Sequence, residues 1–426
     1  MAGEFESITA AIKTIYPPKA VEAMTNEDAP FRKALNKQVP AGAMPTEGIV
    51  KFGGNLNPPQ NQGQLLDGGS LPVPKDRDDV QFQLTPTLYA GGFQIGMITR
   101  SAGSSGKSAF NKGELARRTE ETLSNLGKFI EQTYTGTHGT GRRARVEAST
   151  SSTANFTAAL PEGTALLKEK QYISIRTTDG GSTVDSSVDL RSITAINHDT
   201  RLVTFSGATA SLTAGSHVHP VVEAAQSITS VNPFANGLRG LVDDATFLTT
   251  VEGLSRSTYP KLKSIVNSNG GVLRNLTEAI LIRVLHETYT RSGKRPTDCW
   301  TGPGQFEKYI EFVAPDRRYM VPEQGIDVLK TGYKALVHVT PSGPINLNLS
   351  VDIVPRELYL LNWSTFFHYV AKEMDWWDGD MLKPTPTSGG FKASYMAHLV
   401  SIENIGCDMP LANAVVRDLR DPRAGD

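Results

Sequence analysis

Residues 103–108, with the sequence Gly-Ser-Ser-Gly-Lys-Ser, come closest to a known chemical motif, because glycine-rich loops that end in Lys-Ser can hold nucleotide phosphates. In such loops four residues separate the first glycine from the Gly-Lys pair, so that successive backbone N–H groups surround the phosphates. Only two serines intervene here, and Ser101 stands where the first glycine is needed. No acidic strand end that could hold Mg²⁺ follows. The spacing therefore favours a loop leading into a helix over a nucleotide site.

Histidines and cysteines offer little for metal chemistry. His217 and His219 share one face of an expected strand and could form a metal pair, but no cysteine or carboxylate cluster accompanies them. A surface strand fits this pattern better. Cys299 and Cys407 lie far apart and have no partner spacing, which excludes a zinc site or a disulfide framework. We therefore expect no metal, no cofactor, and folding in a reducing cytoplasm.

Two short clusters could contact a partner. Residues 142–145 (Arg-Arg-Ala-Arg) could touch nucleic acid, but a solvated loop or an ion pair between subunits fits so short a basic run better. Trp376 and Trp377, flanked by aspartates, concentrate aromatic area and serve either as a core anchor or as an interface. Neither cluster has the residue types of a catalytic site.

A third cluster carries both signs of charge. Such a run suits pairing with a neighbouring subunit, and a plain soluble loop is the alternative. Its members are Lys75, Asp76, Arg77, Asp78 and Asp79.

Composition narrows the function classes. The chain has 426 residues and a net charge of −1, so it has room for two or three domains and no overall basic field that would attract nucleic acid or an anionic membrane. The first residues lack the basic and apolar regions of a secretory signal, and no apolar window is long enough to span a membrane. No catalytic order of Ser, His and Asp and no catalytic carboxylate pair occurs. We predict that the chain is not an enzyme.

The first hundred residues predict an arm and an extended loop. Residues 17–39 contain two short helical pieces, with Pro30 in the first turn of the second. Residues 41–86 are too rich in Gly and Pro for a helix. Residues 80–84 alternate as a strand, and residues 88–100 are a second strand-like run. We predict that these two runs form a long hairpin with the Gly/Pro-rich part at its tip.

Residues 114–133 predict the most regular helix of the chain. At 1.5 Å per residue it forms a rod of roughly 30 Å. Opposite charges at i,i+4 support it on its polar side. One apolar stripe, which must pack on a sheet, consists of Leu115, Leu123, Leu126, Phe129 and Ile130.

The remainder predicts a β-rich insert followed by a mixed α/β half. Residues 160–222 contain short alternating strands and turns, which indicates a small β-barrel or sandwich. In the later half, residues 276–292 and 304–312 predict helices. The predicted strands there cover residues 335–339, 349–353 and 395–405.

Taken in this order, the segments resemble the major capsid proteins of tailed bacteriophages, which share the Hong Kong 97-type fold. The arm, the extended loop and the long spine helix come first. Residues 237–244, Gly-Leu-Arg-Gly-Leu-Val-Asp-Asp, resemble the entry into the axial domain of that fold. Further matches are the strand-to-helix passage at 297–309, later strands at 317–319 and 351–361, and a return strand at 395–410.

The resemblance implies an α+β fold with six parts. These are an N-terminal arm at 1–40, an extended loop hairpin at 41–100, a peripheral domain with the spine helix at 101–145, an inserted β domain at 146–230, an axial domain at 231–390, and a return strand with the C-terminus at 391–426. The β insert departs from the family pattern. The chain also starts directly before the arm, which leads us to expect a separate scaffolding protein or none.

What the resemblance implies about function is self-assembly into an icosahedral phage head that encloses double-stranded DNA. Its partners would be other copies in hexamers and pentamers, portal, scaffolding and decoration proteins, and packaged DNA held without sequence specificity, with no membrane and no cofactor. Its location would be the virion capsid, after assembly in the host cytoplasm. The assembly candidates are the mixed-charge run Lys75 to Asp79 and the stripe residues Leu123, Leu126 and Ile130.

Two alternatives stay open. An encapsulin-type compartment shell would share the fold but carry cargo enzymes, and the β insert and long arm favour the phage capsid over it. A nucleotide-dependent enzyme that uses Lys107 belongs to a different class. A nucleotide-binding titration separates it from a shell protein.

Overall fold

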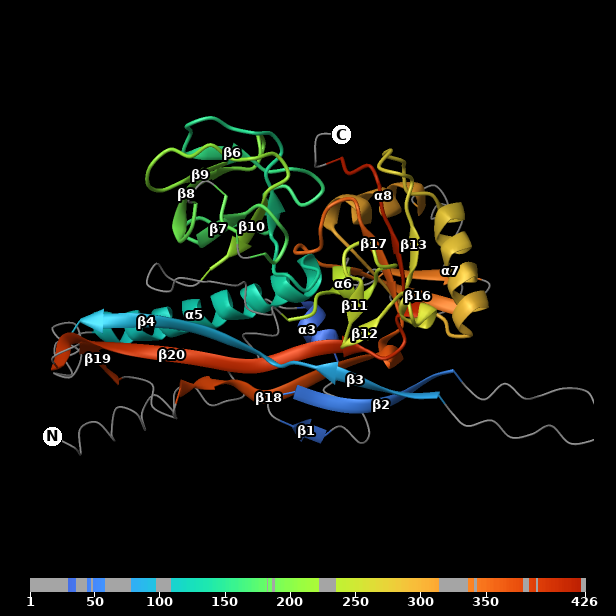
Figure 1. Cartoon of the computed structure of the whole chain (residues 1–426), viewed down its shortest axis with the longest axis horizontal. Helices are drawn as coiled ribbons and strands as arrows, with labels where there is room; N and C mark the ends of the chain where they lie inside the picture. The colour runs from blue at the N-terminus through green and yellow to red at the C-terminus, as the bar shows by residue number, and fades with distance from the viewer. Residues whose placement is uncertain are drawn as a thin grey trace, which may run out of the picture.

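The computed structural model describes residues 30–35, 44–46, 49–57, 78–96, 109–181, 183–185, 188–221, 235–313, 336–340, 343–377, 383–387 and 390–422. A long helix and long strands form an elongated platform, and two lobes stand on it (Figure 1). One lobe is all β, and the other is mixed. The predicted α+β class is confirmed.

The platform sheet is built around one very long strand, β20 (Gly390–Cys407). Its 18 residues span roughly 60 Å at about 3.3 Å each. β18 (Phe366–Trp376) and β19 (Lys383–Thr387) pair in succession with one edge of β20, and β4 (Thr87–Gly96) pairs with the other edge, all antiparallel. The strand predicted at 395–405 is the centre of this sheet.

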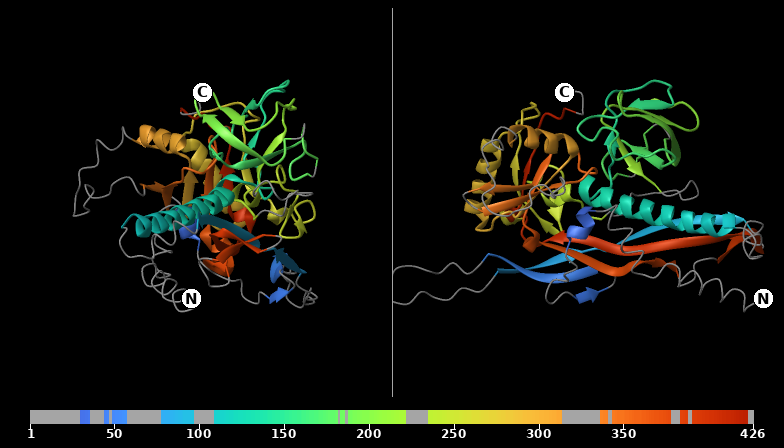
Figure 2. Two further views of the ribbon diagram at one scale, coloured as in Figure 1. Left: turned by 90° about the vertical axis from the view of Figure 1, so that its left-hand side faces the viewer. Right: turned by 180° about the vertical axis from the view of Figure 1, so that it is seen from behind.

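The long helix α5 (Ala109–Gly136) lies along this sheet in both Figure 1 and Figure 2. The predicted helix is confirmed, although it begins five residues earlier and ends three residues later than expected. Leu123, Leu126 and Ile130 are buried in one core with residues of β4, β18 and β20. Tyr89 of β4 packs edge-on against the ring of Tyr134, with 6.4 Å between the centroids. Three stripe residues therefore pack on a sheet of their own chain, whereas Phe129 is partly buried and the side chain of Leu115 lies outside the described part of the structure.

The hairpin forms between different strands from those predicted. β2 (Ile49–Asn57) pairs with β3 (Asp78–Leu84), and the short β1 (Met44–Thr46) adds to the other edge of β2. The predicted pairing of residues 80–84 with 88–100 is wrong, because β3 pairs with β2 and β4 pairs with β20. Proline restricts the residue before it to extended conformations, so the chain continues from one sheet into the next without reversing.

One piece of the predicted arm lies among the described residues. α3 (Pro30–Ala34) begins at Pro30, as predicted, and its Phe31 is buried between Trp300 and Trp363. The first predicted piece lies outside the described residues. The arm segment is thus part of the platform core.

The β lobe is a closed six-stranded barrel with a core of its own. An isolated bridge between Val146 and Ala158 joins the two outer strands, so the sheet has no free edge. Its region begins earlier than the predicted residue 160, because the first two strands are too short to give an alternating pattern. The strands are β5 (Ala144–Arg145), β6 (Asn155–Thr157), β7 (Tyr172–Arg176), β8 (Arg191–Asn197), β9 (Leu202–Phe205) and β10 (His217–Pro220).

The mixed lobe contains a six-stranded sheet and two helices. Thr277 caps the start of α7 (Glu278–Ser292), and Gly293 ends it in the left-handed region at φ 69°. α8 (Pro303–Val313) follows β14, which confirms the predicted strand-to-helix passage. The sheet order is β13 (Ile265–Asn267), β21 (Ala414–Val416), β17 (Leu358–Leu361), β14 (Asp298–Thr301), β16 (Gly343–Leu349) and β15 (Leu336–Thr340).

One strand predicted for this lobe is absent. The run at 349–353 is a turn, because β16 ends at Leu349 and the chain must turn before it returns as β17. Among the described residues, no helix is long and apolar enough to cross a membrane.

Short elements connect the platform with the mixed lobe. They are α6 (Leu238–Leu241), β11 (Thr250–Val251), β12 (Leu254–Ser255) and the 3₁₀ helices η1 (Pro260–Leu262), η3 (Trp363–Thr365) and η5 (Pro410–Ala412).

Candidate assembly site

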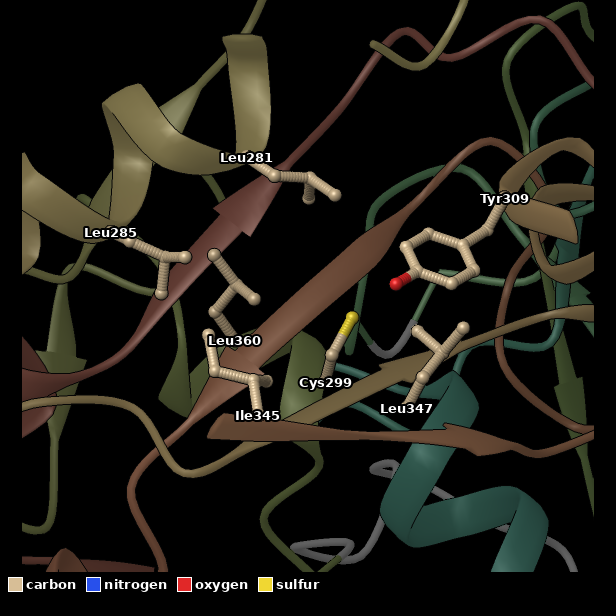
Figure 3. A pocket seen from close by; sticks show the side chains of 7 residues that line it. All are labelled: Leu281, Leu285, Cys299, Tyr309, Ile345, Leu347 and Leu360. Atoms are coloured by element: carbon tan, nitrogen blue, oxygen red, sulfur yellow. The ribbon is translucent and has the colours of Figure 1, made fainter. Parts of the chain in front are cut away.

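The mixed lobe holds a small apolar cavity between its sheet and helices (Figure 3). Its volume is about 10 Å³, which is no more than one water molecule requires. Leucine and isoleucine side chains surround it together with Tyr309 and Cys299. Burial raises the pKa of the Cys299 thiol well above its ordinary value, so this sulfur stays protonated and is a poor nucleophile. The cavity is a packing gap in the core and has the chemistry of neither a substrate site nor a cofactor site.

The structure describes some, but not all, of the residues considered for nucleotide or metal binding. The glycine-rich segment 103–108 lies outside the described residues, so its lack of nucleotide binding stays a prediction. In the described part of the chain, no group of three or more His, Cys, Asp or Glu side chains is arranged to hold a metal ion. His217 and His219 do lie together on β10, but the expected surface strand is wrong for His219, which is completely buried.

The structure separates the predicted assembly residues into two groups. Leu123, Leu126 and Ile130 are inside the platform core, so any part they have in assembly is through folding. Asp78 and Asp79 begin β3, opposite Asn57 and Asn55 of β2. Lys75, Asp76 and Arg77 lie outside the described residues. The described strands of the hairpin, β2 and β3, lie at the end of the platform that is beneath the mixed lobe (Figure 1).

Open strand edges are the feature of the platform that another copy could use. Among the described strands, β18 pairs only with β20, and β1 pairs only with β2. Each therefore presents backbone N–H and C=O groups along one side, and such edges add strands from a partner readily. The edge of β4 is partly occupied, because the Arg118 guanidinium donates to the Gln94 carbonyl at 2.8 Å.

The arm is fastened to α5 by buried charges that sequence reasoning missed. The Glu131 carboxylate accepts hydrogen bonds from the backbone N–H groups of Phe31 and Arg32, at 2.8 and 3.0 Å. Arg32 also pairs at 3.1 Å with Glu403 of β20, which is held by His368 at 2.8 Å. Burial raises the pKa of Glu131 to about 7. The sequence signal for this contact was an acidic residue, Glu131, directly after Ile130 of the buried stripe.

The two Trp residues at the end of β18 have different environments. Trp376 packs edge-on against Phe93 of β4, with 6.3 Å between the centroids, while Trp377 is 47% exposed. The Lys372 ammonium lies 5.8 Å from the Trp377 ring. The core-anchor interpretation thus holds for the first tryptophan, and the second offers aromatic area at the platform surface.

The basic cluster at 142–145 is neither a solvated loop nor free to pair with another subunit at its first two positions. Arg142 and Arg143 are both buried within the chain. Arg143 reaches back to α5, where it donates to the Gln132 and Thr133 side chains at 2.9 and 3.0 Å and stacks on the Phe129 ring. The expected exposure is wrong because these residues link the barrel to the end of α5.

Arg142 belongs to a buried ionic network that joins the two lobes. Arg142 and Arg239 both donate to Glu162 of the barrel, at 2.9 and 2.5 Å. Arg239 also pairs with Glu357 of the mixed lobe at 3.0 Å. These cations hold the pKa of Glu162 far below its ordinary range despite burial. The ionised Glu162 carboxylate is therefore shared between Arg142, which precedes β5, and Arg239 of α6.

An aromatic ring lies at the centre of this network. The guanidinium carbons of Arg239 and Arg417 are each 4.6 Å from the centroid of Phe247, and that of Arg142 is 5.9 Å away. Arg417 also pairs with Asp243 at 3.1 Å. Alternating carboxylates and the π face of Phe247 stabilise three like charges close together. The network joins the barrel to α6, to the mixed lobe and to Arg417 near the end of the chain.

No family model matches the chain, and no curated protein does so either. Among solved structures, it is similar to the capsid asymmetric unit of cyanophage A-1(L), with 13% identity, a TM-score of 0.47 and coverage of 95% of this chain and 99% of that chain.

Two other similar structures are shells of different kinds. The capsid of an empty GTA particle has 7% identity, a TM-score of 0.42 and coverage of 92% of this chain and 90% of that chain. A virus-like particle from Pyrococcus furiosus has 9% identity, a TM-score of 0.34 and coverage of 94% and 96%. At these identities and TM-scores the likeness carries no argument about function. The function proposed for the chain rests on its own geometry.

Proposed function

We propose that this chain is the structural subunit of a closed protein shell, and more specifically the major capsid protein of a tailed bacteriophage. The observation that carries the proposal is the division of the chain into two lobes and a long platform, on which β18 and β1 each pair with only one other described strand. A self-contained enzyme gains nothing from this shape. A shell subunit needs it, because each copy must contact several neighbours at once.

Assembly follows from many modest contacts. The hairpin β2–β3 would lie over the platform of a neighbour, and the open edges of β18 and β1 would contact further copies. Because closure of a shell makes each later contact intramolecular, no single interface has to be strong. The copies would form hexamers and pentamers around double-stranded DNA, which a chain of net charge −1 contacts without sequence specificity. Portal, scaffolding and decoration proteins and assembly in the host cytoplasm complete this proposal.

The hairpin gives the first test. Deleting residues 48–75 would remove β2, whose Val50 and Phe52 are buried in the platform core. A loss of shells in that variant could then result from misfolding as well as from failed assembly. A cleaner variant replaces residues 58–77 with Asn-Gly, which closes a two-residue turn between the paired Asn57 and Asp78. We expect a soluble subunit with unchanged circular dichroism and thermal unfolding that forms no stable shells in electron micrographs. Normal shells from this variant would contradict the role assigned to the hairpin.

A further inference from the structure

Three imidazoles surround one carboxylate where the barrel meets the platform. His138, two residues beyond the end of α5, contacts Asp179 at 2.6 Å between Nε2 and Oδ2. His217 and His219 of β10 approach the same carboxylate, with nitrogen to oxygen distances of 3.8 and 3.7 Å. Asp179 follows β7 of the barrel, whereas the His138 ring also packs on Phe247, 5.3 Å between centroids. The cluster thus spans the boundary between the barrel and the rest of the chain.

We propose that this histidine cluster makes the joint of the barrel acid-sensitive, so that protonation of the imidazoles loosens the barrel from the platform while both parts stay folded. The proposal concerns the subunit itself and does not depend on whether the chain forms a capsid.

The charges around the cluster explain why added protons are unfavourable. Arg142, whose guanidinium contacts Asp179 at 2.7 Å, already supplies its positive partner. The other charged groups that act on the imidazoles are Arg145 of β5, Arg176 of β7 and Arg239 of α6, and Glu162 is shared between Arg142 and Arg239. Asp179 and Glu162 therefore already have cationic partners when the imidazoles are neutral. Protonation of all three imidazoles would add three positive charges around these two carboxylates.

Burial strengthens this effect. His219 is completely buried, and neither of its ring nitrogens has a hydrogen-bond partner. A proton on Nε2 would face Oδ1 of Asp179 at 3.7 Å, beyond hydrogen-bond distance, on a carboxylate whose other oxygen already contacts Arg142 and His138. Loosening the joint lets water reach the imidazolium groups, which removes the cost of burying them.

The pH range follows from the direction of each shift. Burial lowers the pKa of His138 and His217 and lowers the pKa of His219 to about 4. A histidine with a lowered pKa in the closed joint binds its proton more readily when the joint is open. The closed form is therefore fully favoured above about pH 6.5 and loses stability as the pH falls toward 4.

Two buried carboxyl groups, Glu131 of α5 and Glu252, which contacts β20, respond in the opposite direction. Burial raises the pKa of Glu131 to about 7 and that of Glu252 to about 8. For these groups the contribution to stability is present at low pH and is lost as the pH rises through those values. Acid therefore favours the folded platform at Glu131 and Glu252. The barrel also has a closed sheet and a separate core, so it can move without unfolding.

Distance measurement between two spin labels tests the proposal. Cys299 and Cys407 are buried, so labels can be directed to Asp199→Cys on the barrel and Val272→Cys on the mixed lobe, both at exposed positions. The labelled full-length chain is mixed with excess unlabelled chain so that only intramolecular distances are read. We expect one narrow distance distribution at pH 7.5 and a broadened one at pH 5, with the ratio of open to closed forms at least about tenfold higher, which corresponds to one unit of pKa. Identical distributions at the two pH values would overturn the proposal.

Histidine variants identify the responsible groups. Replacing His138, His217 and His219 together by Gln should abolish the broadening at pH 5, whereas His286→Gln on the exposed side of α7 should leave it unchanged. If the triple variant does not fold, His217→Gln, at the least buried of the three positions, should move the transition to lower pH. Broadening that survives in these variants, or far-UV circular dichroism lost at the same pH, would refute a local joint.

Discussion

Replacing Leu126 by Asp is expected to prevent the subunit from reaching a stable fold. Leu126 is buried in the platform core, where α5 covers the sheet. An unpaired carboxylate placed there costs several kcal/mol, which is comparable with the whole stability of a typical domain, about 5–15 kcal/mol. The expected result is aggregated or degraded protein, read as loss of soluble yield and of a cooperative unfolding transition.

Glu120→Ala is the matched control, because Glu120 is exposed on the same helix. It removes a surface charge, favours the helix slightly, and should leave yield and assembly unchanged. The two changes differ in the face of α5 that they alter. If Leu126→Asp were as soluble and as stable as Glu120→Ala, the packing of α5 on the sheet described above would be incorrect.

Replacing Arg239 by Met is expected to lower the free energy of unfolding by about 3 kcal/mol, because it leaves two buried carboxylates, Glu162 and Glu357, without their shared partner. The value is at the low end for a broken buried pair, since Arg142 and Arg417 remain within 4 Å of these carboxylates. Urea unfolding of the unassembled subunit measures it.

Arg291→Met provides the comparison at an exposed ion pair. Arg291 contacts Glu287 at 2.7 Å, but its side chain is 60% exposed, so its loss should cost less than about 0.5 kcal/mol. Arg239→Lys should fall between the two variants, because an ammonium keeps the charge but cannot bridge both carboxylates in the fixed geometry of a guanidinium. Equal stability of Arg239→Met and Arg291→Met would show that the network does not hold the lobes together.

The parts of the fold that the sequence predicts are those with a strong local pattern. The apolar stripe on α5, the helical pattern of α7 and the alternation within β20 depend on neighbouring residues, and all three elements are confirmed. The residues of one segment do not reveal which distant strand it pairs with. β4 is therefore assigned to the wrong partner, because nothing in residues 88–100 distinguishes β3 from a strand that lies some three hundred residues later.

The buried charges show a second limit. Arg142 and Arg143 look like a surface run, because an arginine in sequence gives no indication of the carboxylates that surround it in space. Glu162, Arg239 and Glu357 are far apart along the chain, and only the fold brings them together. The sequence signal that remained was weaker: a cluster of charge placed directly between the end of a long helix and the start of a β domain.

Electron microscopy combined with sedimentation velocity on the purified full-length chain is the most direct test of the central claim. The account predicts closed shells, or ring-shaped assemblies of several copies that convert to shells as concentration rises. The 46.1 kDa monomer should then be a minor species. A chain that is fully folded by circular dichroism but sediments as a monomer at every concentration, with no particles on the grid, would contradict it.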